Sequence, residues 1–169
     1  MYRLQRAIEA LSVVFGHVAA ALIVPLAAVT VFEVFSRYLF NAPTIWAYEL
    51  AYMGTGTIFL LGIAYTFKEG AHVRIDVLTM NLPRQRNAWL NLIGHLIILF
   101  PVVGLVTWSL WEYFLDAYRW GETTGESAWN PVLWPFRLIF VLGLLLFLLQ
   151  GLAEAIKAVR TLRGADGNG

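Results

Sequence analysis

The segment FKEGAHVRIDVL, Phe67–Leu78, separates two long apolar runs and carries five charged or ionisable side chains. Such a cluster is costly inside a bilayer, where an unpaired charge costs about 3 kcal/mol or more. The chain around it is 59% hydrophobic and only 14% charged, against about 25% charged in soluble domains. Its mean hydropathy is +0.67. These values predict an integral membrane protein in which Phe67–Leu78 is a polar connection between two spans.

Four apolar stretches are long enough to cross a bilayer, which requires about 20 residues per helix. They are residues 11–32, 45–67, 88–114 and 132–156. The sequence therefore predicts an all-α membrane protein, a single domain with four transmembrane helices. Residues 71–83 mix apolar and charged positions, which predicts an interfacial amphipathic helix between spans two and three. The tail GADGNG, residues 164–169, is predicted to be disordered.

The basic residues predict the orientation. Nine of the 12 Lys and Arg residues flank the chain ends or the connection between spans two and three. They are Arg3, Arg6, Lys68, Arg74, Arg84, Arg86, Lys157, Arg160 and Arg163. Because cytoplasmic segments of membrane proteins carry an excess of Lys and Arg, both termini are predicted to be cytoplasmic.

Several kinds of chemistry are excluded or unsupported. The chain has no cysteine, which excludes disulfides, thiolate nucleophiles and Cys-ligated metal sites. A formal net charge of +1 gives no indication of a nucleic-acid partner. His72, Arg74 and Asp76 lack an accompanying nucleophile, and they offer too few ligands for a metal site. We expect Arg74 to reach lipid headgroups and Asp76 to hold His72 or Arg74.

Glu49 lies about one turn inside the second span, where a carboxylate needs a partner. Arg37, across the short turn that contains Asn41–Pro43, is the nearest candidate, and Glu33 precedes Arg37 by four residues, an order that favours a helical ion pair. Three roles remain open for Glu49: a charge cluster that locks the first hairpin, an ion or proton site, and a contact with another subunit.

Small and polar residues predict helix–helix contacts. Gly54, Gly56 and Gly62 would let a second helix approach the second span closely, either within this chain or from a partner. Gln150 lies deep in the fourth span, and we expect an interhelical hydrogen bond there.

Six of the seven Trp residues fall near the predicted outer boundary: Trp46, Trp108, Trp111, Trp120, Trp129 and Trp134. Indole prefers the headgroup region, so they are interpreted as an aromatic belt. The alternative is that part of this surface contacts another protein, because Trp is enriched at such contacts.

Two further functions are open alternatives. His17 and His95 are predicted at similar depth on spans one and three, and two imidazoles at one level could ligate haem in a b-type cytochrome or quinone-reactive anchor. Glu49 could instead serve as the proton-coupled carboxylate of a homo-oligomeric exporter.

The central region resembles a known family. SRYLFNAPTIWAYELAYMGTGTIFLLGIAYTFKEGAHVRIDVL is similar to the signature region of the small membrane subunit of tripartite ATP-independent periplasmic (TRAP) transporters. Matching features include Arg37 followed by FNAP, an aromatic before Glu49, and EGAHVRIDVL. GETTGESAWNPVLWPFRLIFVLGLLLFLLQG also resembles that family. The resemblance covers about residues 37–160, and the first span matches by hydropathy alone.

The resemblance implies a division of labour in an inner-membrane, Na⁺-coupled uptake system for an organic acid or similar small polar solute. A periplasmic binding protein captures the solute, and a large many-span subunit carries the substrate and Na⁺ sites. The small subunit is then non-catalytic, without a cofactor or metal of its own. It braces the large subunit's static scaffold, contacts membrane lipids and helps to dock the binding protein.

The residues expected to serve subunit contacts or structure combine the costly polar groups with the motif residues. They are Arg37, Trp46, Glu49, Gly54, Gly56, His72, Arg74, Asp76, Trp129, Pro131, Trp134, Pro135 and Gln150.

Overall fold

The computed structural model describes residues 2–70 and 84–165, which are largely helical. The elements are α1 (Tyr2–Leu39), α2 (Ala47–Lys68), α4 (Arg84–Gly94), the π-helical turn η1 (His95–Leu99), α5 (Phe100–Trp120) and α6 (Trp134–Ala165). In the described residues, four helical segments are long and apolar enough to cross a membrane, the third being continuous through α4, η1 and α5. The prediction of an all-α, four-span membrane protein is confirmed.

The predicted interfacial helix, residues 71–83, lies outside the described residues, and so do His72, Arg74 and Asp76.

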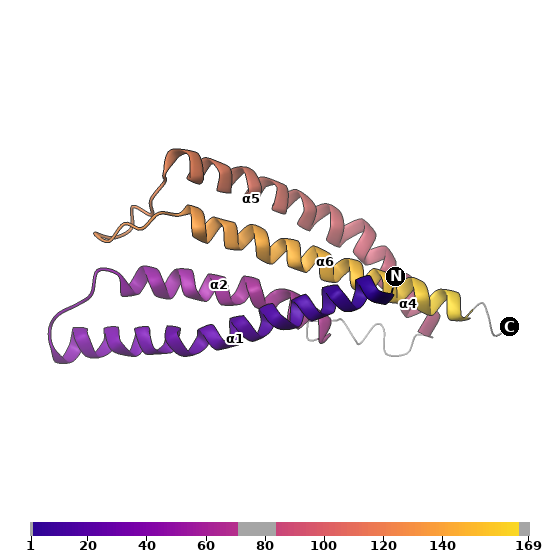
Figure 1. Cartoon of the computed structure of the whole chain (residues 1–169), viewed down its shortest axis with the longest axis horizontal. Helices are drawn as coiled ribbons and strands as arrows, with labels where there is room; N and C mark the ends of the chain where they lie inside the picture. The colour runs from indigo at the N-terminus through magenta and orange to yellow at the C-terminus, as the bar shows by residue number, and fades with distance from the viewer. Residues whose placement is uncertain (1, 71–83, 166–169) are drawn as a thin grey trace.

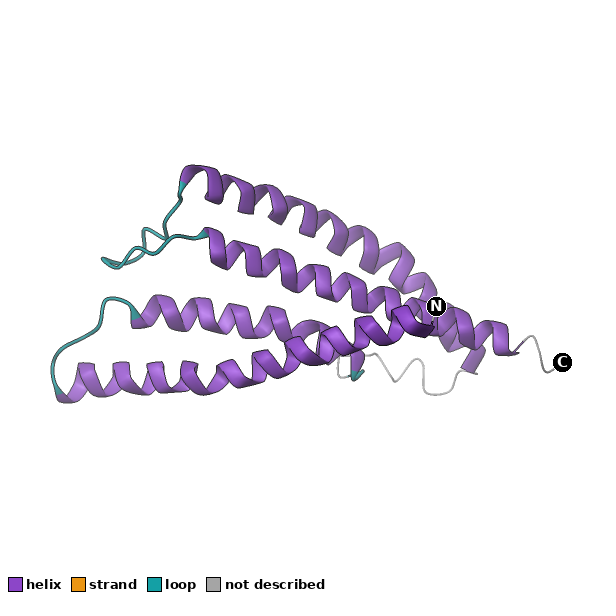
Figure 2. Ribbon diagram, viewed as in Figure 1, coloured by secondary structure: helices purple, strands orange, loops and turns teal. Residues whose placement is uncertain are grey.

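The helices form a fan in which α6 is central (Figure 1). Helix α1 packs on α2, and α6 contacts α1, α2, α4 and α5. In the most apolar stretch of α6, 39% of residues are buried, against 6% in α1 and in the α4–α5 segment. The N-terminus and the end of α6 lie at one end of the fan, and the two short connections lie at the other (Figure 2). We refer to these as the terminal end and the loop end.

Helices α1 and α6 extend beyond the apolar stretches recognised in the sequence. Helix α1 runs from Tyr2 to Leu39, whereas the predicted span was 11–32, and α6 runs through Gly164 and Ala165, the first two residues of the predicted disordered tail. Hydropathy marks the part of a helix that suits hydrocarbon. It does not mark where the helix ends, because polar turns at the ends are held by hydrogen bonds and ion pairs instead.

A change of helical geometry divides the third span. The backbone N–H of Phe100 donates to the carbonyl of His95, five residues earlier, and the next residue is Pro101. Proline has no N–H to donate, and its ring clashes with the carbonyl four residues before it in a regular α-helix. A widened π-turn at this point accommodates both effects without ending the span.

The centre of the fan is packed with alanine and leucine side chains, and a glycine brings α2 and α6 close together. Ala19, Leu61, Ala64 and Leu146 form a buried cluster between α1, α2 and α6. At Gly143 of α6 an added Cβ would lie 2.7 Å from the backbone oxygen of Leu60 on α2. Close helix approach of this kind drives association in membranes, where the hydrophobic effect between helices is absent.

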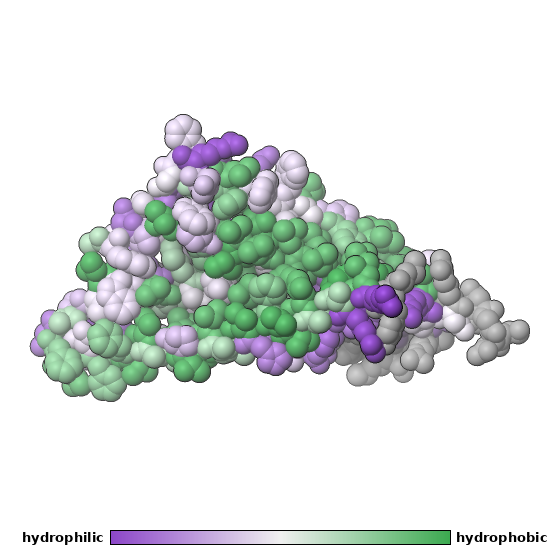
Figure 3. Space-filling model, viewed as in Figure 1, coloured by the Kyte–Doolittle hydropathy of each residue, from purple (hydrophilic) through white to green (hydrophobic). Residues whose placement is uncertain are grey.

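Large apolar side chains instead point outward. The space-filling view shows apolar residues over the middle of the visible face and polar residues near its ends (Figure 3). Val24 on α1 is 72% exposed and Leu105 on α5 is 71% exposed. This distribution suits a protein surrounded by lipid or by other apolar protein surfaces.

Candidate functional site

Glu49 is the most deeply buried carboxylate described, with 1% of its surface exposed. It lies in the first turn of α2, where the partial positive charge of the helix N-terminus favours a negative side chain. The Oγ1 of Thr124, in the connection between α5 and α6, donates a 2.8 Å hydrogen bond to Glu49 Oε2. Glu49 Oε1 has no hydrogen-bond partner among the described residues.

The predicted pairing of Glu49 with Arg37 is wrong. The Arg37 Nε donates to Oε1 of Glu33 at 3.0 Å, the i,i+4 ion pair expected from the sequence. The Oε2 of Glu33 accepts from the backbone N–H and the hydroxyl of Thr44. Glu33 therefore holds the first connection, while Glu49 faces the opposite neighbours, α5 and α6. Sequence proximity suggested Arg37, but Glu33 lies on α1 and Glu49 on α2, and the two helices direct these carboxylates to different partners.

Arg137 is the other buried charge at the loop end, with 6% of its surface exposed. It occupies the first turn of α6 and forms a 2.7 Å ion pair with Glu122. Its Nη1 donates to the backbone oxygen of Tyr113 at 2.9 Å, and its guanidinium lies 3.3 Å from the centre of the Tyr113 ring. These contacts join α5 to α6, and the partners of the Arg137 guanidinium belong to the same chain.

The connection between α5 and α6 has a defined turn structure that places Thr124 and Glu122. It begins at Gly121, whose φ of +60° is a left-handed conformation that glycine adopts without steric cost. Backbone hydrogen bonds then pair Thr124 N with Pro131 O and Leu133 N with Glu122 O. Within the turn, the N–H of Gly125 donates to the side chain of Asn130.

A cavity of about 390 Å³ lies between α2, α5, α6 and this connection. Its polar lining residues are Glu49, Thr124, Glu126 and Arg137. Its remaining lining is aromatic or aliphatic: Tyr48, Tyr52, Leu110, Tyr113, Leu133, Phe136 and Phe140. The rim residues Tyr48, Tyr52 and Tyr113 are 67%, 59% and 52% exposed. We call this space the Glu49 cavity. No residue set in the sequence indicated it, because its lining comes from four separated segments.

The predicted glycine contacts are internal to the chain. A Cβ at Gly54 would meet the side chain of Leu26 on α1 at 3.0 Å, and one at Gly56 would meet the Phe136 ring of α6 at 3.0 Å. Both glycines thus permit packing of α2 against its own neighbours.

The aromatic and proline motif residues order the loop end. Trp46 precedes α2, and its ring stacks on Phe32 at 6.0 Å. Trp134 begins α6 and packs edge-on against Tyr118 at 5.7 Å. Pro135 follows in the first turn of α6, where its missing N–H costs no helical hydrogen bond. Trp129 and Pro131 belong to the connection itself.

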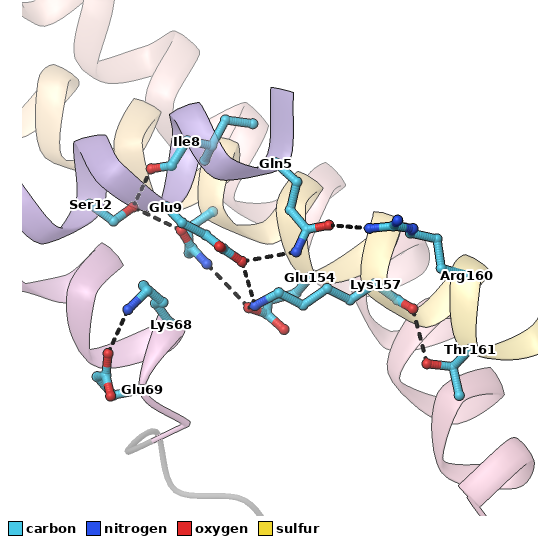
Figure 4. Close-up of polar contacts among 11 residues, drawn as sticks. Gln5, Ile8, Glu9, Ser12, Lys68, Glu69, Glu154, Lys157, Arg160 and Thr161 are labelled. Carbon is cyan, nitrogen blue, oxygen red and sulfur yellow. Dashed lines mark hydrogen bonds and ion pairs between the residues drawn. The ribbon is translucent and has the colours of Figure 1, made fainter. Parts of the chain in front are cut away.

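Gln150 forms the interhelical hydrogen bond expected from the sequence. Ser12 Oγ on α1 donates to Gln150 Oε1 at 2.8 Å, and Gln150 is fully buried. The bond belongs to a larger set between α1 and α6 that we call the α1–α6 polar chain (Figure 4). Its members are Gln5, Glu9, Ser12, Gln150, Glu154, Lys157 and Arg160.

Lys157 joins two carboxylates in this chain. Its Nζ lies 2.8 Å from Glu9 on α1 and 2.7 Å from Glu154 on α6. From the sequence, Lys157 was expected only to indicate orientation, and no role was predicted for Glu9 or Glu154. Glu9 and Glu154 are carboxylates near the ends of two apolar segments, and this position was the available indication that they need partners.

The two candidate haem ligands pack near Tyr65 and Phe67, which lie two residues apart at the end of α2. His17 Nδ1 lies 2.8 Å from the carbonyl oxygen of Val13, and the His17 ring packs near Tyr65. His95 Nδ1 is bonded to the carbonyl of Asn91, and its ring lies 5.6 Å from Phe67. In residues 2–70 and 84–165, no group of three or more His, Cys, Asp or Glu side chains could hold a metal ion.

The fold and the site define a multi-span membrane protein whose polar groups mostly pair with one another. Residues 26–161 match the family described as tripartite ATP-independent periplasmic transporters, DctQ component. The chain belongs to this family, which confirms the resemblance found in its central region.

Two curated relatives agree with the family. The chain is 29% identical over 93 residues to the C4-dicarboxylate TRAP transporter small permease protein DctQ of Vibrio cholerae, covering 54% of this chain and 40% of that protein. It is 28% identical over 101 residues to the sialic acid TRAP transporter permease protein SiaT of Haemophilus influenzae, covering 57% of this chain and 16% of SiaT. The chain thus matches less than half the length of either relative.

Proposed function

We propose that this chain is the non-catalytic small permease subunit of a Na⁺-coupled TRAP-type uptake system. In this role it braces the scaffold of a large membrane subunit in the inner membrane and helps to dock a periplasmic binding protein. The observation that carries the proposal is the family match over residues 26–161.

The internal pairing of polar groups supports a static role. At the terminal end, the α1–α6 polar chain joins α1 to α6. At the loop end, the Arg137–Glu122 pair joins α6 to the connection that precedes it. A solute pathway would need polar groups facing a continuous open route. Polar side chains that join helices to one another make this chain suited to be a rigid part of the complex. Na⁺ binding and substrate selection are therefore assigned to the large subunit.

The relatives support both the partner and the substrate class. The region shared with SiaT is 16% of that protein, so most of that permease has no counterpart in this chain. We infer that a separate, larger membrane subunit supplies the corresponding part here. One relative is named for C4-dicarboxylates and the other for sialic acid, and both solutes carry carboxylates. An organic acid is accordingly the proposed cargo.

The orientation follows from the basic residues. Arg3, Arg6, Lys157 and Arg160 belong to the terminal end, which we place in the cytoplasm by the positive-inside rule. The loop end, with the Glu49 cavity and with Trp120, Trp129 and Trp134 in or beside the α5–α6 connection, then faces the periplasm, where the binding protein docks.

Deletion of the gene tests the proposal. Uptake of the organic acid should be lost while the large subunit still reaches the membrane, and expression of this chain in trans should restore uptake. Normal uptake in the deletion strain would refute the proposal. Solute transport by this chain alone in liposomes would favour the exporter alternative.

A further inference from the structure

Among the described residues, Glu49 Oε1 has no hydrogen-bond partner, which points to a further binding partner. A carboxylate can accept about four hydrogen bonds. Glu49 is 1% exposed and accepts one bond, from Thr124, while its Oε1 accepts none from the described residues. A buried polar atom without a partner is destabilising, so such atoms are rare in folded proteins unless something binds them. Glu49 lines the 390 Å³ cavity, which has room for such a ligand.

The cation in the cavity wall does not meet this need. Arg137 is bound to Glu122 at 2.7 Å and to the Tyr113 backbone oxygen at 2.9 Å. Its guanidinium also lies against the Tyr113 ring. Turning it toward Glu49 would break these contacts and leave Glu122 without its ion pair. Within residues 2–70 and 84–165, one oxygen of Glu49 thus stays unpaired, while the arginine that lines the same cavity is bound to other groups.

The lining selects for an organic cation. Glu49 and Glu126 both contribute carboxylates, which disfavours an anion. A Ca²⁺ or Mg²⁺ site requires about six oxygen ligands, more than these two side chains provide. The exposed rings of Tyr48 and Tyr52 line the cavity, where their faces can contact a cation or an apolar stem, whereas the Tyr113 ring already faces Arg137. An alkylammonium or guanidinium group matches both features.

We propose that the Glu49 cavity receives one lysine or arginine side chain from the large membrane subunit, whose charged tip binds the Glu49 carboxylate once Oε1, which the chain covers, turns toward the cavity. This inference rests on the proposed function, which supplies that partner. Lysine and arginine carry an apolar stem behind a charged tip, which suits a cavity lined by tyrosine rings and by the carboxylates of Glu49 and Glu126. An ethanolamine lipid is a poorer match, because its phosphate would lie beside two carboxylates while Arg137 is bound to Glu122.

Co-purification of the assembled complex tests the inference. The tagged large subunit is purified in mild detergent with wild-type chain, with Glu49→Gln or with the control Glu112→Gln, an exposed carboxylate on α5 bonded to Trp108. Glu49→Gln keeps the shape of the side chain and removes its charge. We expect it to lower the recovered small subunit about tenfold or more, the usual result of removing one side of a buried charge pair. Glu112→Gln should match wild type.

Cross-linking identifies the occupant without relying on that variant. Benzoylphenylalanine in place of Tyr52, at the rim, should cross-link to a peptide of the large subunit that contains a Lys or Arg. Replacing that cation with Met should weaken the complex as much as Glu49→Gln does, with no further loss when both changes are combined. Cross-linking to a lipid, or to a peptide without Lys or Arg, would overturn the inference.

The outcomes separate the two proposals. If the wild-type chain does not co-purify with the large subunit, the proposed function fails. If the wild-type complex forms and Glu49→Gln forms it equally well, only the lysine–arginine inference fails. Native mass spectrometry provides an independent test. If the intact wild-type complex carries an ethanolamine phospholipid that the intact Glu49→Gln complex lacks, the inference is overturned.

Discussion

Ser12 on α1 and Gln150 on α6 are 138 positions apart and joined by a 2.8 Å hydrogen bond between two buried side chains. The bond fixes the register of the first span against the last. Because Gln150 also donates to Glu154 at 3.1 Å, the pair links the apolar middle of the bundle to the ion pairs of Lys157.

A double-mutant cycle on this pair should show energetic coupling. Ser12→Ala and Gln150→Leu should each lower the free energy of unfolding in detergent. The coupling should be about 0.6 kcal/mol and at most about 2 kcal/mol, the range found for hydrogen bonds between membrane helices. Thr107→Val is the control, because Thr107 is buried but bonds to Val103 of its own helix. Coupling between Thr107 and Gln150 as large as that of the proposed pair would contradict the assignment.

Gly143→Ala should weaken the packing of α2 against α6. The new Cβ would lie 2.7 Å from the Leu60 backbone oxygen, so one helix has to move away. We expect a loss of about 1–3 kcal/mol in thermal unfolding, as for overpacked cores. Gly104→Ala in α5 is the matched control, since its added Cβ would meet no other helix of the described residues within 4 Å. It should be neutral or slightly stabilising, because alanine favours helix over glycine. Equal losses at both positions would show that the α2–α6 contact is not the cause.

Arg137→Lys should loosen the loop end. Lysine keeps the charge, but it cannot reproduce the planar contact with Tyr113 together with the ion pair to Glu122. The expected cost is about 1–3 kcal/mol, between the values for exposed and buried pairs, because Glu122 remains partly exposed. Hydrogen exchange should rise in residues 121–133 and not at the terminal end. The exposed Arg119 provides the control Arg119→Lys, and unchanged exchange in both variants would argue against the role of Arg137.

Glu33 and Arg37 should behave unequally although they form one ion pair. Glu33 accepts from Arg37 and also from two groups of Thr44, whereas Arg37 is exposed and its bonds end at Glu33. Glu33→Gln should therefore lower the unfolding temperature of the isolated chain more than Arg37→Gln. If Arg37→Gln then lowers the yield of the assembled complex without altering stability, its predicted role at a subunit contact is supported. A larger loss of stability for Arg37→Gln would contradict the structural account.

Local pattern was sufficient for the membrane class and for several individual contacts. Hydropathy revealed four spans because a bilayer requires about 20 apolar residues per helix whatever the helices pack against. The i,i+4 spacing of Glu33 and Arg37 gave their ion pair, since helical geometry alone brings such residues together. The cost of an amide in lipid indicated that Gln150 needs a partner, although it did not name Ser12.

The partners of distant residues depended on the folded chain. Glu49 was paired with Arg37 because they are near in sequence, yet the structure gives it Thr124, 75 positions away. Gly143 passed unnoticed in an apolar run, because its importance depends on the backbone of Leu60 on another helix.

The amino-acid sequence by itself determined that this protein is helical, spans a membrane four times and belongs among DctQ components. Those properties follow from the local composition and from motifs that can be recognised in the sequence without knowledge of the fold. Only the tertiary structure decided that, in the part of the chain that the structure describes, one oxygen of the cavity-lining Glu49 has no partner while Arg137 is bound elsewhere. Which charges meet is set by how the helices cross, and that arrangement depends on the packing of all of them together.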